Sequence, residues 1–90
     1  MLANASLYIS NMTITNNMHL YIINEVLTDF TSGMAVIAAP SIMRCRELFE
    51  LEFNSYSMEE FDTAINNNDY QVIMNVEHPE GIVSYVYGGG

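Results

Sequence analysis

The chain has 90 residues, of which 50% are hydrophobic, and its 11 aspartates and glutamates stand against only two basic residues, Arg44 and Arg46. The formal net charge of -9 repels phosphate backbones and anionic lipids, so we expect no direct binding to nucleic acid or to a membrane. The length fits a single domain over residues 1–90, whose modest core a homodimer would stabilise further. The single cysteine, Cys45, excludes an intramolecular disulfide and fits a reducing compartment.

The N-terminal sequence predicts no export from the cell. Residues 1–11 contain no basic residue and no unbroken apolar run, unlike a secretory signal. No segment approaches the roughly 20 apolar residues that a membrane helix requires. We therefore expect a soluble, cytoplasmic protein.

Three strands are expected in the first half of the chain. Residues 7–14 are rich in β-forming residues and give the first strand, within an N-terminal extension over residues 1–17. Residues 18–27 have the period of two that is typical of a strand. Turn-forming residues at 28–33 then separate this strand from a buried strand at 34–39, which predicts an antiparallel hairpin. The two faces of the 18–27 strand carry Met18, Leu20, Ile22 and Val26 on one side and His19, Tyr21, Ile23 and Glu25 on the other.

Two helices follow the hairpin. Pro40 ends the strand, Ser41 can cap the next helix, and apolar residues spaced by three and four predict a long helix through residue 53. Ser57 and Glu60 have the spacing of a capping box, in which each side chain satisfies a free backbone donor of the other residue. This spacing predicts a second, short helix over about 58–65, ended by the asparagines at 66–68.

The last third of the chain predicts two more strands. Residues 70–76 alternate between two faces, and residues 78–81 suit a type I turn, so we expect residues 82–87 to pair back on the preceding strand. Residues 88–90 form a glycine tail. The order of elements predicts an α+β fold, a small antiparallel or mixed sheet of about five strands covered on one face by one long and one short helix.

No residue pattern indicates catalysis or a metal site. Cys45 lies on the apolar stripe of its helix and is expected in the core, while His19 and His78 belong to no ligand pattern. The acidic cluster at 59–62 lacks the alternating ligands and the glycine of a calcium loop, and stabilisation by the helix dipole explains it. We therefore expect no enzymatic activity, no metal and no cofactor.

The acidic residues are concentrated in one stretch of the chain. Residues 47–80 contain nine acids and no basic residue. Carboxylates along two helices can present negative charge to a basic groove that normally binds a nucleic-acid backbone, and aromatic residues are enriched in interfaces. This distribution suggests nucleic-acid mimicry; the alternative is an ordinary solvated helix face. The expected partner-binding residues are Glu47, Glu50, Glu52, Glu59, Glu60, Asp62, Asp69 and Tyr56.

The run VLTDFTSGMAVIAAPS, followed by a helix, a β-hairpin and the closing YVYGGG, resembles small acidic orphan proteins of bacteriophages and prophages. The resemblance covers most of residues 18–90. Proteins of this kind include anti-CRISPR inhibitors, which bind bacterial effector complexes and block recognition of target DNA. The resemblance implies a phage-encoded inhibitor of a bacterial defence system, which acts in the host cytoplasm on a basic host protein or ribonucleoprotein effector complex.

Two other functions stay open. The chain has a strand hairpin, a helix, further strands and a terminal Gly89–Gly90. This arrangement is similar to that of ubiquitin-like β-grasp proteins and sulfur carriers, whose diglycine carboxylate is adenylated. A small structural or assembly protein of a phage particle would need no special target for its acidic surface. An inhibitor predicts a salt-sensitive heteromeric complex, a carrier predicts dependence on a free Gly90, and an assembly protein predicts homo-oligomers of high copy number.

Overall fold

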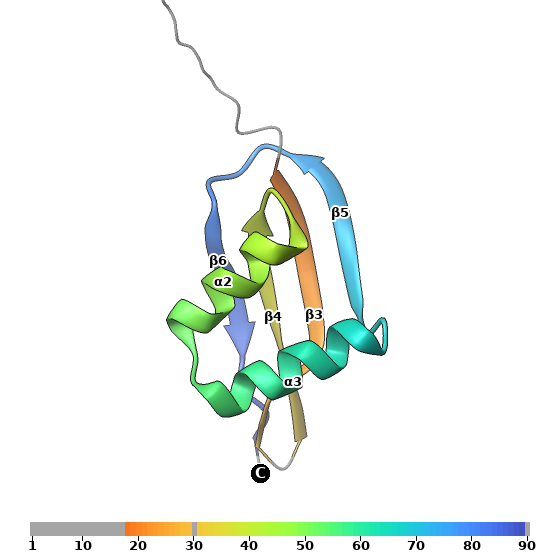
Figure 1. Cartoon of the computed structure of the whole chain (residues 1–90), viewed down its shortest axis with the longest axis vertical. Coiled ribbons are helices and arrows are strands. Elements are labelled where there is room, and N and C mark those ends of the chain that lie inside the picture. Colours follow the sequence, from red (N-terminus) through yellow and green to blue (C-terminus); the bar gives the residue numbers. More distant parts are fainter. Residues whose placement is uncertain (1–17, 30, 90) are drawn as a thin grey trace, which may run out of the picture.

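Two helices lie on one face of a four-stranded antiparallel sheet in the computed structural model, which describes residues 18–29 and 31–89 (Figure 1). The predicted α+β class and the helical cover on one face are confirmed, with four described strands where about five were expected. The strand expected at 7–14 lies outside the described residues. The elements in chain order are β3 (Met18–Asp29), β4 (Thr31–Ala39), α2 (Ile42–Glu52), α3 (Ser55–Asn66), β5 (Tyr70–Val76) and β6 (Gly81–Val86).

The predicted hairpin is confirmed, and both of its strands are longer than expected. β3 and β4 pair antiparallel, with Asp29 opposite Thr31 at the end near the turn. Gly33 lies in β4 where a Cβ atom would be only 2.1 Å from the carbonyl oxygen of Val86. The absence of a side chain at Gly33 therefore allows the C-terminal part of the chain to pack closely on the hairpin.

Irregularities near the end of β3 change which side chains face the core. Glu25 and Leu27 have positive φ angles of 58° and 55°, and the register with β4 shifts on both sides of Val26. Such a bulge interrupts the alternation of faces. Val26 is consequently fully buried in the same cluster as Tyr21 and Ile23. The prediction that Val26 lies on the opposite face from these two residues is wrong.

The strand order is β5-β3-β4-β6, so the last two strands lie at opposite edges of the sheet (Figure 1). β5 pairs with β3, and β6 pairs with β4. The prediction that residues 78–81 form a turn between paired strands is therefore wrong, because this segment crosses from one edge to the other. The β3–β4 hairpin has one unpaired edge on each side. β5 and β6 each form backbone hydrogen bonds with one of these edges.

Both helices have clear N-terminal caps. The Ser41 hydroxyl accepts a hydrogen bond from the Arg44 backbone N–H at 3.2 Å, as predicted. α3 is capped by Asn54, whose Oδ1 accepts from the Ser57 N–H at 2.9 Å. The predicted capping box of Ser57 with Glu60 is wrong, because asparagine is an equally good cap and its use adds a turn to the helix. The two helices thus have 11 and 12 residues and are not one long and one short helix.

The core lies between the helices and the sheet. The rings of Phe49 and Phe61 join α2 to α3 with a centroid distance of 4.9 Å. Cys45 is fully buried in this core, as its place on the apolar helix stripe predicts. The sheet contributes Tyr21, Ile23, Val26, Leu27, Ala35, Ile37 and Ala39.

Candidate functional site

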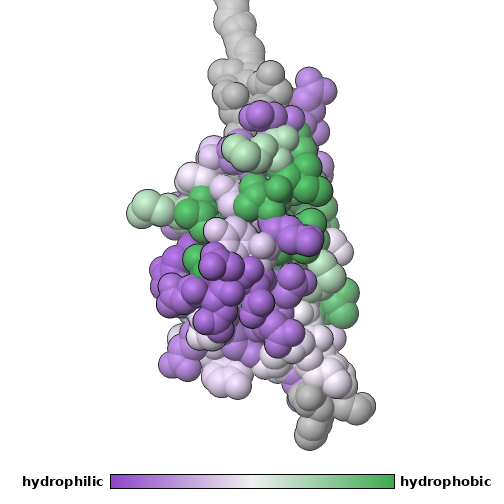
Figure 2. Space-filling model, turned by 90° about the vertical axis from the view of Figure 1, so that its right-hand side faces the viewer, coloured by the Kyte–Doolittle hydropathy of each residue, from purple (hydrophilic) through white to green (hydrophobic). Residues whose placement is uncertain are grey.

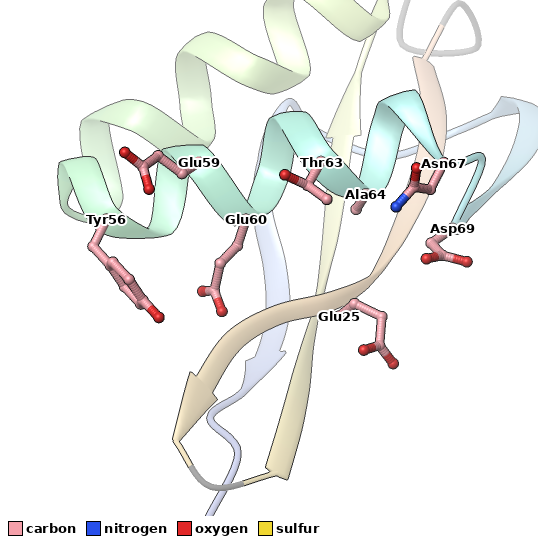
Figure 3. A pocket seen from close by; sticks show the side chains of 8 residues that line it. All are labelled: Glu25, Tyr56, Glu59, Glu60, Thr63, Ala64, Asn67 and Asp69. Carbon is pink, nitrogen blue, oxygen red and sulfur yellow. The ribbon is translucent and has the colours of Figure 1, made fainter.

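A groove of about 330 Å³ lies between α3 and the bulged part of β3 (Figure 3). Four of its eight lining residues are carboxylates, and none is basic. A surface of this composition favours a cationic ligand group. The lining residues are Glu25, Tyr56, Glu59, Glu60, Thr63, Ala64, Asn67 and Asp69.

The helical repeat of α3 builds one wall of this groove. Its lining residues between 56 and 67 are spaced mainly by three and four, which places them along one side of a helix. In Figure 3 the side chains of Tyr56 and Glu60 project from this helix toward the hairpin. Asp69 enters after the turn that ends α3, and its carbonyl oxygen accepts a hydrogen bond of 3.0 Å from the Asn24 N–H of β3. This bond holds the helix end beside the strand that carries Glu25.

Neutral donors hold two of the four carboxylates in place. The hydroxyl of Thr28 donates to Glu60 Oε2, and the Thr28 backbone N–H donates to the same oxygen at 3.3 Å. The Ser32 hydroxyl donates to Glu25 Oε1 at 2.8 Å. Among the described residues, none of the four groove carboxylates forms an ion pair. The hydrogen bonds to Glu25 and Glu60 therefore orient these two negative charges without neutralising them.

Ion pairs with the two arginines divide the acidic surface. Arg44 pairs with Glu47 at 3.1 Å and with Glu80 at 3.0 Å, and Arg46 pairs with Asp62 at 2.8 Å. The hydrogen bond from Arg46 lowers the pKa of the Asp62 carboxyl. Glu47 and Asp62 therefore lie beside positive charge, and the acidic row expected along both helices is interrupted.

The predicted partner-binding residues fall into two groups. The groove brings together Tyr56, Glu59, Glu60 and Asp69. The other four lie outside it: two in ion pairs, and two exposed on α2. Those four residues are Glu47, Asp62, Glu50 and Glu52.

Sequence reasoning missed Glu25 as a groove residue. It assigned Glu25 to one face of a regular strand, whereas the positive φ angle and the register shift beside it place Glu25 in the groove wall. The available signal was a charged residue on the expected strand face that also carries the apolar Ile23, which is a position where a bulge can occur. That signal alone does not locate the bulge.

The C-terminal glycines are part of the fold. The Gly88 N–H donates to the Leu27 carbonyl at 2.9 Å, and Gly89 and Thr31 exchange two hydrogen bonds of 3.0 Å. Gly88 is buried, and a Cβ atom there would lie 1.6 Å from the Thr31 carbonyl oxygen. Residues 88 and 89 therefore pack on the β3–β4 hairpin near its turn.

Comparison with known proteins gives no relative: no protein-family model matches the chain, and no curated protein or solved structure is significantly similar to it. Within residues 18–29 and 31–89, no group of three or more His, Cys, Asp or Glu side chains is placed to hold a metal ion. The same part of the chain has no helix with the length and apolar character needed to cross a membrane.

Proposed function

We propose that this protein acts by binding a basic partner, and that it inhibits a bacterial defence system as the resemblance to small acidic phage proteins implies. The partner is a basic host protein or a ribonucleoprotein effector complex. Carboxylates of the groove occupy positions on that partner where phosphates of a nucleic acid would lie. The observation that carries the proposal is the gathering of four carboxylates and a tyrosine in one groove without a basic residue.

The chemistry of the groove suits arginine and lysine side chains. A guanidinium can donate two parallel hydrogen bonds to a carboxylate, and bonds between charged groups are stronger than neutral ones. Tyr56 is 64% exposed at the rim, where its ring can stack on a guanidinium. Because the groove has a volume of only about 330 Å³, the proposed mimicry concerns a few phosphate positions and not a long stretch of duplex.

The other two functions stay predictions. A carrier protein needs a free terminal carboxylate, and an assembly protein needs extended homo-oligomers. Neither requires an acidic groove. The capture experiment described next separates the inhibitor from the carrier, and extended homo-oligomers of the purified chain would favour the assembly protein.

The proposal is tested by capturing partners from nuclease-treated bacterial lysate on the N-terminally tagged full chain and identifying them by mass spectrometry. We expect a basic complex that handles nucleic acid, with or without residues 88–90. Its affinity is then measured for a groove variant carrying Glu25→Gln, Glu59→Gln and Asp69→Asn. Glutamine keeps the acceptor for Ser32, and Glu60 is left unchanged because it holds Thr28.

The matched control removes the same number of negative charges outside the groove, with Glu50→Gln, Glu52→Gln and Glu77→Gln. We expect the groove variant to weaken binding roughly tenfold or more, while the control changes mainly the association rate and its salt dependence. Equal effects of both variants would show that only the overall charge matters. Recovery of an adenylating enzyme alone, lost on deletion of 88–90, would replace the proposal with the carrier function.

A further inference from the structure

The edge strand β6 combines an unpaired backbone edge with exposed aromatic side chains. It pairs with β4 on one side, and no other strand of the described residues lies along its outer side (Figure 1). Its sequence, GIVSYV, contains neither a charged residue nor a proline, the residues that commonly prevent an edge strand from pairing with another chain. The register with β4 shifts once, and residues 84–86 beyond the shift pair regularly. This half of β6 is therefore suited to accept a further strand.

Three aromatic rings lie together beside this half of β6. Tyr85 belongs to β6, Tyr87 follows it, and Phe53 caps the C-terminal end of α2. The ring centroids are 5.2, 5.6 and 6.2 Å apart, and the rings are nearly perpendicular, which is the favourable edge-to-face arrangement. Tyr85 is 44% exposed and Tyr87 is 58% exposed. Mutual packing thus fixes the three rings, while part of their surface stays open to a ligand.

Negative charge lies at both ends of β6. At its start, Arg44 pairs with both Glu47 and Glu80, and one guanidinium with two carboxylates leaves a net charge of -1. Past its end, Asp29 lies beside Gly88, where a Cβ atom would be 3.1 Å from the Asp29 backbone nitrogen. Both arginines of the chain already form ion pairs. The charge that complements this edge must therefore come from another molecule.

We propose that β6 binds an extended, basic segment of a partner protein, which adds to the sheet as a further strand. Backbone hydrogen bonds supply affinity in strand addition, and side chains supply specificity. Here arginine or lysine side chains of the partner lie near the acids at the two ends of β6, and one stacks on the rings of Tyr85 and Tyr87.

The charges favour this partner over the other possible covers of the edge. Antiparallel pairing of two β6 strands from two copies would bring the negative start of each strand beside the negative end of the other, and like charges placed opposite each other destabilise a sheet. Residues 1–17 contain neither lysine nor arginine. A basic segment of an unlike protein has the complementary charge that both of these lack.

The probe is a fluorescent peptide of alternating threonine and valine with an arginine at each end, about eight residues long so that it spans residues 81–88. Fluorescence anisotropy measures its affinity for the full-length chain, and hydrogen exchange locates it. We expect protection of backbone amides at 84–87 and none in β5, the other edge strand, whose side of the molecule also exposes apolar residues (Figure 2). N-methyl groups on the central residues of the peptide, or glutamate at both of its ends, should weaken binding roughly tenfold or more.

Tyr87→Ala tests the aromatic contact, with Tyr56→Ala as the matched control. Tyr56 is similarly exposed, at 64%, but lies in the acidic groove. We expect Tyr87→Ala to weaken peptide binding roughly threefold or more, and Tyr56→Ala to change it little. Tyr87→Phe keeps the ring and should bind as the unmodified chain does. Circular dichroism checks that each variant is folded.

The proposal would be overturned if the peptide, at concentrations up to about 1 mM, protected no amide of β6. Protection of β5 alone, or equal weakening by Tyr87→Ala and Tyr56→Ala, would also contradict it. A dimer in sedimentation whose β6 amides are protected without peptide would show that a second copy covers the edge.

Strand addition at β6 does not depend on the function proposed for the groove, because the two surfaces share no residue. The groove variant with Glu25→Gln, Glu59→Gln and Asp69→Asn should still show peptide-dependent protection of β6. Failure of partner capture through the groove and failure of strand addition are thus separate results.

Discussion

Arg44 of α2 binds Glu80 of the β5–β6 crossover through two hydrogen bonds, from Nε to Oε2 and from Nη2 to Oε1, both of 3.0 Å. The planar guanidinium matches the carboxylate, as expected for a bidentate pair. The pair fixes the segment that crosses the end of the sheet to the helix layer. Local sequence patterns did not indicate this contact, because the two residues are 36 positions apart.

The Arg44–Glu80 pair predicts a pH-dependent contribution to stability. Hydrogen bonding to Arg44 lowers the pKa of Glu80 below its ordinary value of 4.5. A carboxyl whose folded-state pKa is lowered stabilises the fold above the unfolded-state pKa, and this contribution is lost as the pH falls through the folded-state pKa. Glu80→Gln should therefore lower the melting temperature slightly at neutral pH and have no effect at strongly acidic pH. The effect is small because the pair is exposed and screened by salt.

Thermal melts of both proteins across this pH range provide the measurement, with Glu77→Gln as the control for loss of an acid without this pair. A difference between the native chain and Glu80→Gln that persists below the pKa of Glu80 would contradict the role of the ion pair.

Gly88→Ala should destabilise the fold, whereas Gly89→Ala should not. The added methyl at Gly88 would meet the Thr31 carbonyl oxygen at 1.6 Å, but a Cβ atom at Gly89 has no heavy atom within 4 Å. Relief of the clash requires movement of the backbone, with an expected cost of about 1–3 kcal/mol. Urea denaturation of the two variants measures the difference. Equal stability would mean that the chain end does not pack on the hairpin.

Asn54→Ala should remove the cap of α3. Loss of a capping side chain costs about 1 kcal/mol, because the Ser57 N–H loses its partner. Ser57→Ala serves as the control, since Ser57 lies inside the first turn and does not cap the helix. The free energy of unfolding of both variants decides between the two caps: a larger loss for Ser57→Ala would restore the capping box as the start of the helix.

Cys45 should be unreactive in the folded protein. Burial raises the pKa of its thiol to about 12, so the nucleophilic thiolate is scarce near neutral pH and reagents have no access to it. We expect no reaction with a thiol-specific reagent in native buffer and one equivalent of reaction in denaturant. Met43→Cys in a Cys45→Ser background is the positive control, because residue 43 is 77% exposed and should react at once. Rapid labelling of native Cys45 would contradict its place in the core.

Local signals in the sequence predicted most of the elements. The hairpin, the Ser41 cap and the burial of Cys45 follow from turn residues, capping chemistry and helical spacing. The strand order could not be predicted in this way, because β6 pairs with β4 through contacts between residues about 50 positions apart. The capping-box spacing of Ser57 and Glu60 also predicted the wrong start for α3, because Asn54, three residues earlier, has an equally suitable capping side chain.

The candidate site was predicted in part. The helical spacing of Tyr56, Glu59 and Glu60 is visible in the sequence, but the contribution of Glu25 depends on a bulge that tertiary packing produces. The ion pair of Arg46 with Asp62 joins two helices, so local sequence patterns likewise could not predict it. A count of charges along the chain therefore overestimates the continuous acidic surface, because the two arginines neutralise part of it.

The strand order has a consequence for synthesis of the protein on the ribosome. The hairpin of β3 and β4 is made first, yet its two outer edges gain their partners only when residues 70–86 have emerged. Until then the nascent chain exposes unpaired backbone groups along apolar strands, which are templates for aggregation. A ribosome that stalls before residue 81 would release a chain without β6, and the β4 edge of that chain would be open to pairing with another copy.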